Sequence, residues 1–410
     1  MSAHVIAGQM LRRGEVALDT VHGPFCAHVF QNVATGTYAF AVAHGEVRGD
    51  EPLLARVHSS CVTSETYGGC DCDCVDQLDL ALQRIAAAGR GIVFYLMQEG
   101  RGAGFTAKAR DRMIVQASRN RLTTFEAYER MGLIRDHRRY DEVAHVSRAL
   151  GIRAPWRLLT NNPEKVSALR GLDVEVAGTV PLRKEASPYN LHYLSAKSRS
   201  GHALEDPGEG ACAADLPEAV RDFAPYALPD EPRFVHLATY LLPIRLRAAG
   251  DARAAATPCW FRVHAYFDLT GGREHVVLAC GPPDAAAPLV HVQRESWLER
   301  FPLASGGVEK HAWQAAVRRI VEHGAGYAAF LPVAGFDCEL RERPADAEAA
   351  VALLAHHVRG RAVHPLRAPD DDAADRVAAA LARRGVVLHD PVALQPERTD
   401  AKPFGGPRPS

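Results

Sequence analysis

Between about residues 25 and 182, apolar runs of strand length alternate with segments whose apolar residues recur at helical spacing. Four apolar runs have the length and composition of strands: 53–58, 91–97, 156–160 and 173–182. Three segments repeat apolar residues at helical spacing or carry helix-capping residues: 75–89, 107–119 and 162–171. Because the run at 91–97 is continuous, we expect a strand that is buried on both faces. The alternation predicts an α/β domain with a mixed or parallel sheet.

The second half of the chain repeats this pattern. ALQRIAAAGRGIVFYL (81–96) aligns without gaps on AVRRIVEHGAGYAAFL (316–331), a shift of 235 residues. Two further segments align at nearly the same shift, 33–45 on 269–281 and 52–61 near 288–297. Chance rarely produces matches of this quality in three consecutive segments, so we infer an internal duplication. The predicted fold class is therefore α/β, with a degenerate second copy of a similar α/β fold.

The two copies differ in the residues that could carry chemistry. A cluster of cysteines in the first copy has no counterpart in the second, where Cys61 falls on or next to Trp297. The glycine-rich turn EGRGAG at 99–104 becomes AGFDCE at 334–339. A stretch rich in Pro, Gly and acidic residues separates the copies, as in a linker. The sequence thus predicts four parts: a domain that carries the chemistry (1–204), a linker (205–232), a non-catalytic repeat domain (233–395) and a disordered tail (396–410).

Composition narrows the class of protein. The chain is 47% hydrophobic and 24% charged, with a net charge of −1, so no positive field favours nucleic acid or a membrane surface. No run of 18 apolar residues and no signal peptide is present, which predicts a soluble, cytoplasmic protein. Four of the nine cysteines crowd into 61–74, which is typical of one metal or redox site in a reduced compartment.

The spacing of these cysteines favours zinc. Cys61, Cys72 and Cys74 lie on a loop that joins a predicted strand to a predicted helix, and Zn²⁺ prefers thiolate ligands. Three protein ligands leave a fourth position for water, as in catalytic zinc sites. Cys70 competes with the others for a place, so a structural site closed by four cysteines stays an alternative. A redox pair fits less well, because the motif is not a CxxC at the start of a helix.

Three other motifs are ambiguous when each is taken alone. EGRGAG could bind phosphate through its backbone N–H groups, but glycine turns are usually only turns. Polar residues of DHRRY (136–140) precede a predicted helix and could simply cap it. Residues 160–162 end a strand and open a helix, where α/β folds often bind ligands but where capping is equally common.

Taken together, these motifs resemble GTP cyclohydrolase II over about residues 15–204. The resemblance is carried by RVHSSC (56–61), CDC (72–74), QEGRGAG (98–104), DHRRY (136–140), LLTNNPEK (158–165) and HYL.AK...GH (192–202). It implies one zinc per chain on Cys61, Cys72 and Cys74, with Mg²⁺ as a further ion if the substrate is a polyphosphate. It also implies that Asp136 accepts a proton and that Arg138 attacks or neutralises the α-phosphate. The nucleotide-binding residues that it implies are Arg56, Val57, His58, Ser59, Ser60, Gln77, Glu99, Gly100, Arg101, Thr124, Thr160 and Lys165.

The sequence departs from the family where the base would bind. Arg112 stands where the family has a tyrosine and Tyr128 where it has an asparagine, and we count both as nucleotide-binding positions. Asp71 and Val75 replace an arginine and a glycine beside the CDC motif. Because the phosphate side is intact, these changes favour a different base on the same phosphate grip.

This layout resembles the relatives of uracil catabolism, which open a uridine nucleotide. We therefore expect UMP or UTP to be hydrolysed to a ribosylurea phosphate and 3-oxopropanoate. The alternative is GTP cyclohydrolase II itself, which converts GTP to formate, pyrophosphate and a diaminopyrimidine. A hypothesis from another functional class is that the protein is a non-catalytic, zinc-stabilised regulator that binds nucleotide. The expected partners are the small-molecule nucleotide and either a second copy in a homodimer or the degenerate half in an internal pseudo-dimer, with neither nucleic acid nor membrane.

Overall fold

The computed structural model describes residues 6–7, 9–205, 224–245, 258–304, 308–332, 344–368 and 372–394. The predicted tail at 396–410 and most of the predicted linker lie outside these residues, as does the segment AGFDCE.

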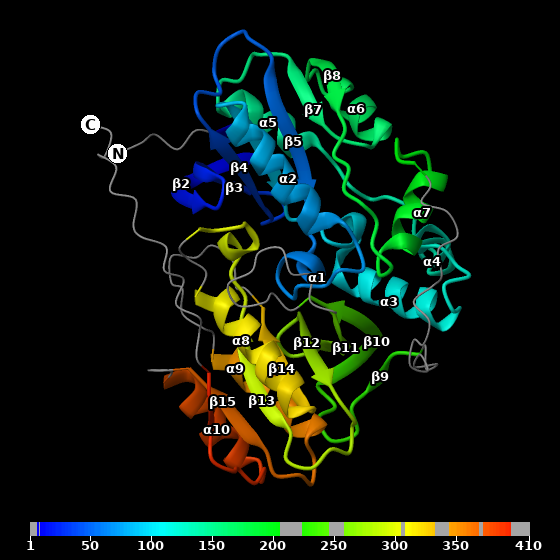
Figure 1. Cartoon of the computed structure of the whole chain (residues 1–410), viewed down its shortest axis with the longest axis vertical. Coiled ribbons are helices and arrows are strands. Elements are labelled where there is room, and N and C mark those ends of the chain that lie inside the picture. The colour runs from blue at the N-terminus through cyan, green and yellow to red at the C-terminus, as the bar shows by residue number, and fades with distance from the viewer. Residues whose placement is uncertain are drawn as a thin grey trace.

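The first half is built on one mixed sheet of eight strands, in the order β1-β2-β3-β4-β6-β5-β7-β8 (Figure 1). The strands are β1 (Ile6–Ala7), β2 (Met10–Thr20), β3 (Gly23–Asn32), β4 (Tyr38–His44), β5 (Leu53–Ser59), β6 (Gly91–Leu96), β7 (Trp156–Leu159) and β8 (Val176–Val180). The helices are α1 (Val62–Glu65), α2 (Cys74–Ala87), the 3-10 turn η1 (Gly100–Gly102), α3 (Gly104–Ala117), α4 (Thr124–Arg130), α5 (Asp141–Ala149), α6 (Pro163–Arg170) and α7 (Leu191–Arg199). Strands β5, β6, β7 and β8 are parallel, and the others are antiparallel to their neighbours.

These elements confirm the predicted pattern to within a few residues. All six residues of β6 are buried, as its continuous apolar run predicts. Helix α6 begins after Asn162, whose side chain accepts a hydrogen bond from the Glu164 backbone N–H, and Pro163 occupies its first turn. Helix α3 starts earlier than predicted, because the glycine-rich turn closes into η1 and runs directly into it.

The second half forms another eight-stranded mixed sheet, in the order β16-β15-β13-β14-β12-β11-β10-β9. The strands are β9 (Tyr226–Ala227), β10 (Phe234–Ile244), β11 (Cys259–Asp268), β12 (Arg273–Cys280), β13 (Leu289–Arg294), β14 (Gly326–Leu331), β15 (His364–Arg367) and β16 (Val392–Ala393). The helices are η2 (Leu298–Arg300), α8 (Val308–His323), α9 (Pro344–His357) and α10 (Asp372–Arg383). Read from the other end, this strand order is that of the first sheet.

Local irregularities are repeated as well, which confirms the duplication. The β2–β3 ladder shifts register after Arg12, and the β10–β11 ladder shifts at the corresponding place after His236. A Cβ on Gly45 would lie 2.3 Å from the Gly89 carbonyl oxygen, and one on Gly281 would lie 2.0 Å from the Gly324 carbonyl oxygen. Such backbone contacts, at positive φ, require glycine in both copies.

The connection that follows the buried central strand is much longer in the first copy than in the second. Residues 97–140 separate β6 from α5, whereas only residues 332–343 separate β14 from α9. The longer segment carries α3, α4 and the DHRRY motif. The second half therefore keeps the sheet but has no room for this segment, in which eight of the nineteen candidate residues lie.

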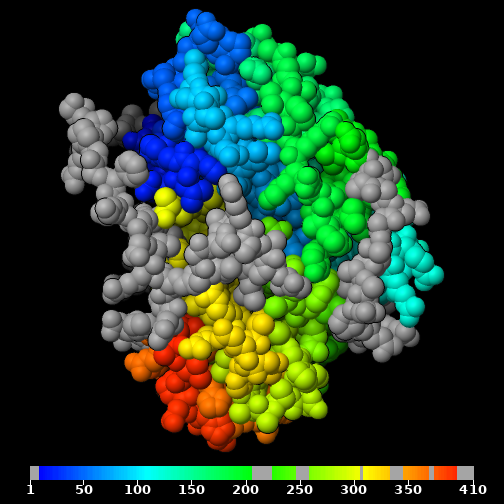
Figure 2. Space-filling view, in the orientation of Figure 1, coloured from blue at the N-terminus to red at the C-terminus, as the bar shows by residue number. Residues whose placement is uncertain are grey.

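The two halves pack against each other through α1 and α3, which lie between the two sheets (Figure 1). In Figure 2 the orange and red residues of the second half lie at the lower end of the molecule, and some of its yellow residues reach the dark blue residues of the first half. One buried apolar cluster joins the halves and contains Val62, Tyr67, Phe105, Ala109 and Met113 of the first with Tyr240, Leu242, Phe261, Val263 and Trp313 of the second. None of the helices in the described part of the chain has the length and apolar character that a membrane crossing requires.

Candidate functional site

The candidate residues gather at the carboxyl edge of the first sheet. Strands β5, β6 and β7 run in the same direction, so the segments that follow them meet at this edge. Residues 60–74 follow β5, residues 97–104 follow β6, and residues 160–162 follow β7. Ligands of open α/β sheets bind at such an edge.

Three thiols form the centre of the site. The Sγ atoms of Cys61, Cys72 and Cys74 all lie within 4.8 Å of one another, and Cys61 and Cys72 are 3.7 Å apart. Cys61 follows β5, while Cys74 opens helix α2. Cys70 lies outside the group and donates its Sγ–H to the Pro243 carbonyl oxygen at 3.4 Å. Within the described residues no fourth thiol joins these three, and three convergent thiols are the donor set of a zinc site with one open position.

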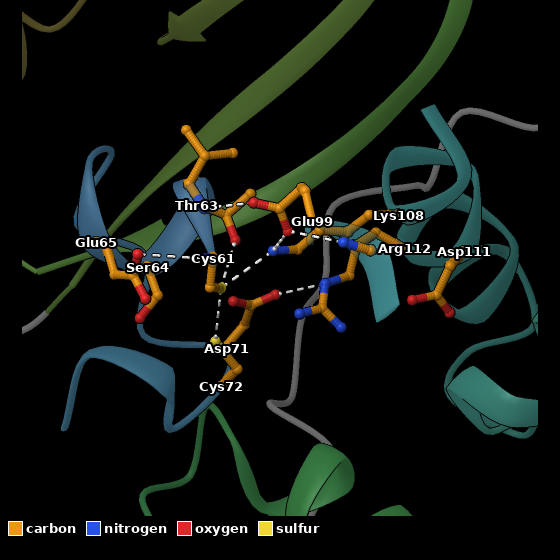
Figure 3. A network of polar contacts seen from close by, with 12 residues as sticks. Cys61, Thr63, Ser64, Glu65, Asp71, Cys72, Glu99, Lys108, Asp111 and Arg112 are labelled. Atoms are coloured by element: carbon orange, nitrogen blue, oxygen red, sulfur yellow. Dashed lines mark hydrogen bonds and ion pairs between the residues drawn. The ribbon is translucent and has the colours of Figure 1, made fainter. Parts of the chain in front are cut away.

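A buried ion pair lies beside the thiols (Figure 3). The Lys108 ammonium on α3 is 3.0 Å from the Cys61 Sγ and 2.7 Å from the Glu99 carboxylate. Glu99 also accepts the Val62 backbone N–H at 2.6 Å. Hydrogen bonds from Cys72 and Cys74, helped by the charge of Lys108, hold the pKa of Cys61 well below its usual value. Cys61 thus favours the thiolate form, which binds metal. The hydrogen bonds with Cys61, together with burial, hold the pKa values of Cys72 and Cys74 well above the usual value.

A second network fixes the loop that begins at Cys61. The Glu65 carboxylate accepts hydrogen bonds from the Cys61 backbone N–H at 3.2 Å and from the Tyr95 hydroxyl at 2.5 Å. It is also 2.7 Å from His58, whose ring stacks on Tyr95. Burial lowers the pKa of His58, and the fully buried carboxylate beside it only partly offsets this effect. His58 therefore supports the thiol loop from within the core.

Cationic side chains form the phosphate side of the site. Arg56 on β5 donates to the Leu159 carbonyl oxygen at 2.8 Å and to Gln77 at 2.7 Å. Lys165 on α6 donates to the Val57 carbonyl oxygen at 2.8 Å. Burial, with the charges of Arg56 and Arg138 close by, holds the pKa of Lys165 well below its usual value. Two buried cations, Arg56 and Lys165, and the partly buried Arg138 repel one another, which is the arrangement of a site prepared for an anion.

Asp136 and Arg138 form a closed pair in the loop before α5. The Arg138 Nε is 2.9 and 3.0 Å from the two Asp136 carboxylate oxygens, and its backbone N–H donates to the same carboxylate at 2.9 Å. Burial raises the pKa of Asp136, but the bonds and charge of Arg138 outweigh it and leave the pKa below its usual value. The loop packs on η1, since a Cβ on Gly102 would lie 2.9 Å from His137.

Two of the residues at which the sequence departs from the resembled family contact each other. Arg112 is 2.9 Å from Asp71 in a largely buried ion pair, and its guanidinium lies 5.3 Å from the ring centre of Tyr193. Both changed residues thus pair with each other beside Cys72 (Figure 3). Tyr128 is buried and donates its hydroxyl to the Gly100 carbonyl oxygen at 2.8 Å. It therefore braces the glycine turn rather than facing open space.

The other predicted residues are placed as follows. Arg101, at a φ of 55°, lies over the Phe125 ring at 3.8 Å. The Thr124 hydroxyl at the start of α4 donates to the Asp111 carboxylate on α3 at 2.8 Å, and this hydrogen bond is buried. The Thr160 hydroxyl accepts the Asn162 backbone N–H at 3.1 Å, so it serves the start of α6. The Ser60 backbone N–H bonds to Leu96, and the Ser59 hydroxyl is buried without a partner among the described atoms.

Several residues of the site were missed by sequence reasoning. Lys197 on α7 is 2.6 Å from Asp73, which in turn accepts from Gln77 at 2.5 Å. Tyr193 and Lys197 lie in the motif at 192–202, but the sequence assigned them no role, and Lys108 lies outside every quoted motif. Tyr240 of the second half buries its hydroxyl without a partner among the described atoms, near the charges of Lys108 and Asp71. No signal in the sequence connects β10 with this site.

Comparison with known proteins gives consistent matches for the first half. The family model described as GTP cyclohydrolase II matches residues 12–181. A GTP cyclohydrolase-2 of Shewanella amazonensis is 40% identical over 190 residues, which are 46% of this chain and 91% of that protein. The riboflavin biosynthesis protein RibBA of Bacillus subtilis is 40% identical over 195 residues, 47% of this chain and 48% of that protein. This chain thus spans nearly all of the first relative and about half of the second.

Proposed function

We propose, because the chain belongs to the GTP cyclohydrolase II family, that its first half is a zinc-dependent nucleotide cyclohydrolase that opens the base ring of its substrate by hydrolysis. The observation that carries this proposal is the group of three thiols, Cys61, Cys72 and Cys74, at the carboxyl edge of a sheet beside a group of buried and partly buried cations. We further propose residues 1–204 as the catalytic domain and 233–395 as a non-catalytic repeat, joined by 205–232.

The residues divide the work by their chemistry. When bound, zinc would supply a Lewis acid that activates water for hydrolysis at neutral pH. Arg56, Lys165 and Arg138 bind the phosphates, because buried cations gain most from an anion that neutralises them. As Arg138 turns to the phosphate it releases Asp136, whose pKa then rises towards that of a proton acceptor. Mg²⁺ would accompany a polyphosphate.

Two substrates have support from different observations. GTP is favoured by the comparisons, since the relatives named GTP cyclohydrolase-2 align over almost their whole length. The comparisons thus favour GTP, which the sequence predicted only as the alternative substrate, over the uridine nucleotide that we expected. The uridine nucleotide is supported by the Arg112–Asp71 pair, which replaces two family residues at the base side. Because this ion pair occupies space on the base side, a pyrimidine, which is smaller than guanine, would suit the site better.

Direct turnover distinguishes the candidates. Zinc-loaded protein is incubated with GTP, UTP and UMP in turn, with and without Mg²⁺, and the ultraviolet absorbance of each base is followed. Formate release from GTP supports the riboflavin-type reaction, whereas loss of absorbance at the uracil maximum supports the uridine reaction. If the protein binds nucleotide and one zinc but turns over none of the three, it is a non-catalytic regulator, and the cyclohydrolase proposal is wrong.

The depressed pKa of Lys165 predicts a pH dependence of phosphate binding. A bound phosphate restores the charge of Lys165, so binding takes up a proton wherever the free lysine is neutral. Affinity should stay constant below the depressed pKa and then fall by up to about tenfold per pH unit above it. Calorimetric titration with inorganic phosphate measures this. A Lys165→Met variant should bind more weakly at low pH and lack this additional slope; an equal slope in both proteins contradicts the assignment.

A further inference from the structure

The loop that bears the zinc cysteines is docked on the degenerate half. Gly69 forms an isolated antiparallel bridge with Ile244 at the end of β10. The Cys70 backbone N–H donates to the Pro243 carbonyl oxygen at 2.9 Å, and the Arg245 N–H donates to Gly68 at 3.0 Å. The loop between Cys61 and Cys72 therefore extends the second sheet by one short pairing.

A tryptophan of the second half holds the same loop. The Trp313 indole N–H donates to the Tyr67 carbonyl oxygen at 3.0 Å, and both residues are buried. The rings of Tyr67 and Trp313 both pack on Phe330 of β14, with centroids 4.4 and 4.9 Å away. The loop approaches so closely that a Cβ on Gly69 would lie 2.6 Å from Leu242 and 2.8 Å from the Thr63 carbonyl oxygen. Only glycine permits this contact.

The other wall of the thiol site is docked on the same strand. Helix α3, which carries Lys108 to Cys61, exchanges two hydrogen bonds of 2.7 Å between the Gln116 amide and the backbone of Leu241. At the first turn of α3, the Thr106 backbone N–H donates to Glu274 of the nearby strand β12 at 2.9 Å. Loop and helix thus share one support, which fixes the Cys61 and Lys108 side chains relative to each other.

The contact has a reciprocal counterpart on the first sheet. Thr20 forms an isolated antiparallel bridge with Leu303, the Val21 N–H donates to Pro302 at 2.8 Å, and the Ala304 N–H donates to Asp19 at 2.9 Å. These residues occupy the positions that Ile244, Gly69 and their neighbours occupy in the other copy. Trp297 packs on Tyr38 of the first sheet, with ring centres 5.2 Å apart. Reciprocal use of the same patches is the mark of a two-fold interface between like subunits.

We propose that the degenerate half acts as a built-in partner subunit whose strand β10 and Trp313 position the zinc loop of the catalytic half. Trp313 is a positioning residue, since it acts on the metal ligands through the Tyr67 carbonyl. Outer contacts of this kind orient metal ligands, and their loss weakens metal binding about 10–100-fold. The inference rests on the zinc site of the proposed function, but it does not depend on which nucleotide is the substrate.

The chain offers a matched pair of variants for the test. Trp313→Phe keeps an aromatic ring but removes the N–H that the Tyr67 carbonyl accepts. Trp297→Phe makes the same change at the other end of the interface, where Trp297 packs on Tyr38 and Phe40 of the first sheet. We expect the zinc dissociation constant of full-length Trp313→Phe to rise about tenfold, and that of Trp297→Phe to change less than twofold. Cobalt substituted for zinc should report altered thiolate-to-metal absorption in Trp313→Phe alone.

A third variant forces the loop away from β10. In Gly69→Ala the added methyl group meets Leu242, so we expect weakened zinc binding and an altered cobalt spectrum. The proposal is overturned if Trp313→Phe keeps the wild-type zinc affinity and cobalt spectrum. It is also overturned if Trp297→Phe loses zinc to the same extent, because general destabilisation then explains both. A wild-type protein that binds no zinc would instead refute the proposed function itself.

Discussion

A Cys72→Ser variant is expected to lose its zinc and, with it, about 10³-fold or more of its turnover. The serine hydroxyl is not ionised at neutral pH, and a metal that prefers thiolate then keeps only two protein ligands. A Lewis acid that stabilises transition-state charge contributes several kcal/mol, and each 1.36 kcal/mol is a factor of ten in rate. Cys61→Ser and Cys74→Ser should behave alike, because all three Sγ atoms lie within 4.8 Å of one another.

Cys70→Ser is the matched control for this prediction. Cys70 shares the loop, but its thiol donates to Pro243, and burial raises its pKa to about 12, which disfavours a thiolate. It should keep one zinc per chain and nearly full turnover. Zinc content by mass spectrometry, measured after gel filtration, checks all four variants. A zinc-free Cys70→Ser protein would indicate a closed four-cysteine site, and a fully active Cys72→Ser protein would exclude a catalytic metal on this cysteine.

The fold was predictable because its signals are local. The buried strand at 91–97 is a continuous apolar run, and helix α2 buries Leu78, Leu82 and Ile85 at helical spacing. The duplication provides a second, independent instance of the same pattern, because β6 and β14 correspond residue for residue at the predicted shift of 235 residues. The boundary of α3 was less predictable, because a glycine-rich turn can continue into a helix without any capping residue.

The site was predictable only where chemistry is concentrated in short motifs. The cysteine spacing and the DHRRY motif identify their residues by type, and the structure places them at one edge of the sheet. Lys108 was not predictable, because its distance of 3.0 Å from Cys61 depends on how α3 lies across the loop. The role of Trp313 depends on two halves that are 246 residues apart at this contact, which no local pattern encodes.

The pairing of Asp136 with Arg138 bears directly on the reaction. A base held by two or more hydrogen bonds to an adjacent guanidinium is ionised at neutral pH but binds a proton poorly. Arg138 is itself almost buried and close to Arg56 and Lys165, so an incoming phosphate attracts it away from the aspartate. Binding of the phosphate thereby prepares the base, which couples the two ends of the nucleotide.

We therefore expect Asp136→Asn to reduce turnover about 10²–10⁴-fold, the usual contribution of a general acid or base, while nucleotide affinity changes little. The amide still accepts a hydrogen bond from Arg138, so the loop should keep its shape. In Arg138→Ala, Asp136 loses the partner that depresses its pKa, while its burial remains. The acidic limb of kcat/KM should then move to higher pH, because activity requires the ionised carboxylate. Steady-state rates from pH 4 to pH 9, with nucleotide affinities from calorimetry, measure both effects. Normal turnover of Asp136→Asn, or an acidic limb that Arg138→Ala leaves in place, would show that Asp136 only shapes the loop and that another group accepts the proton.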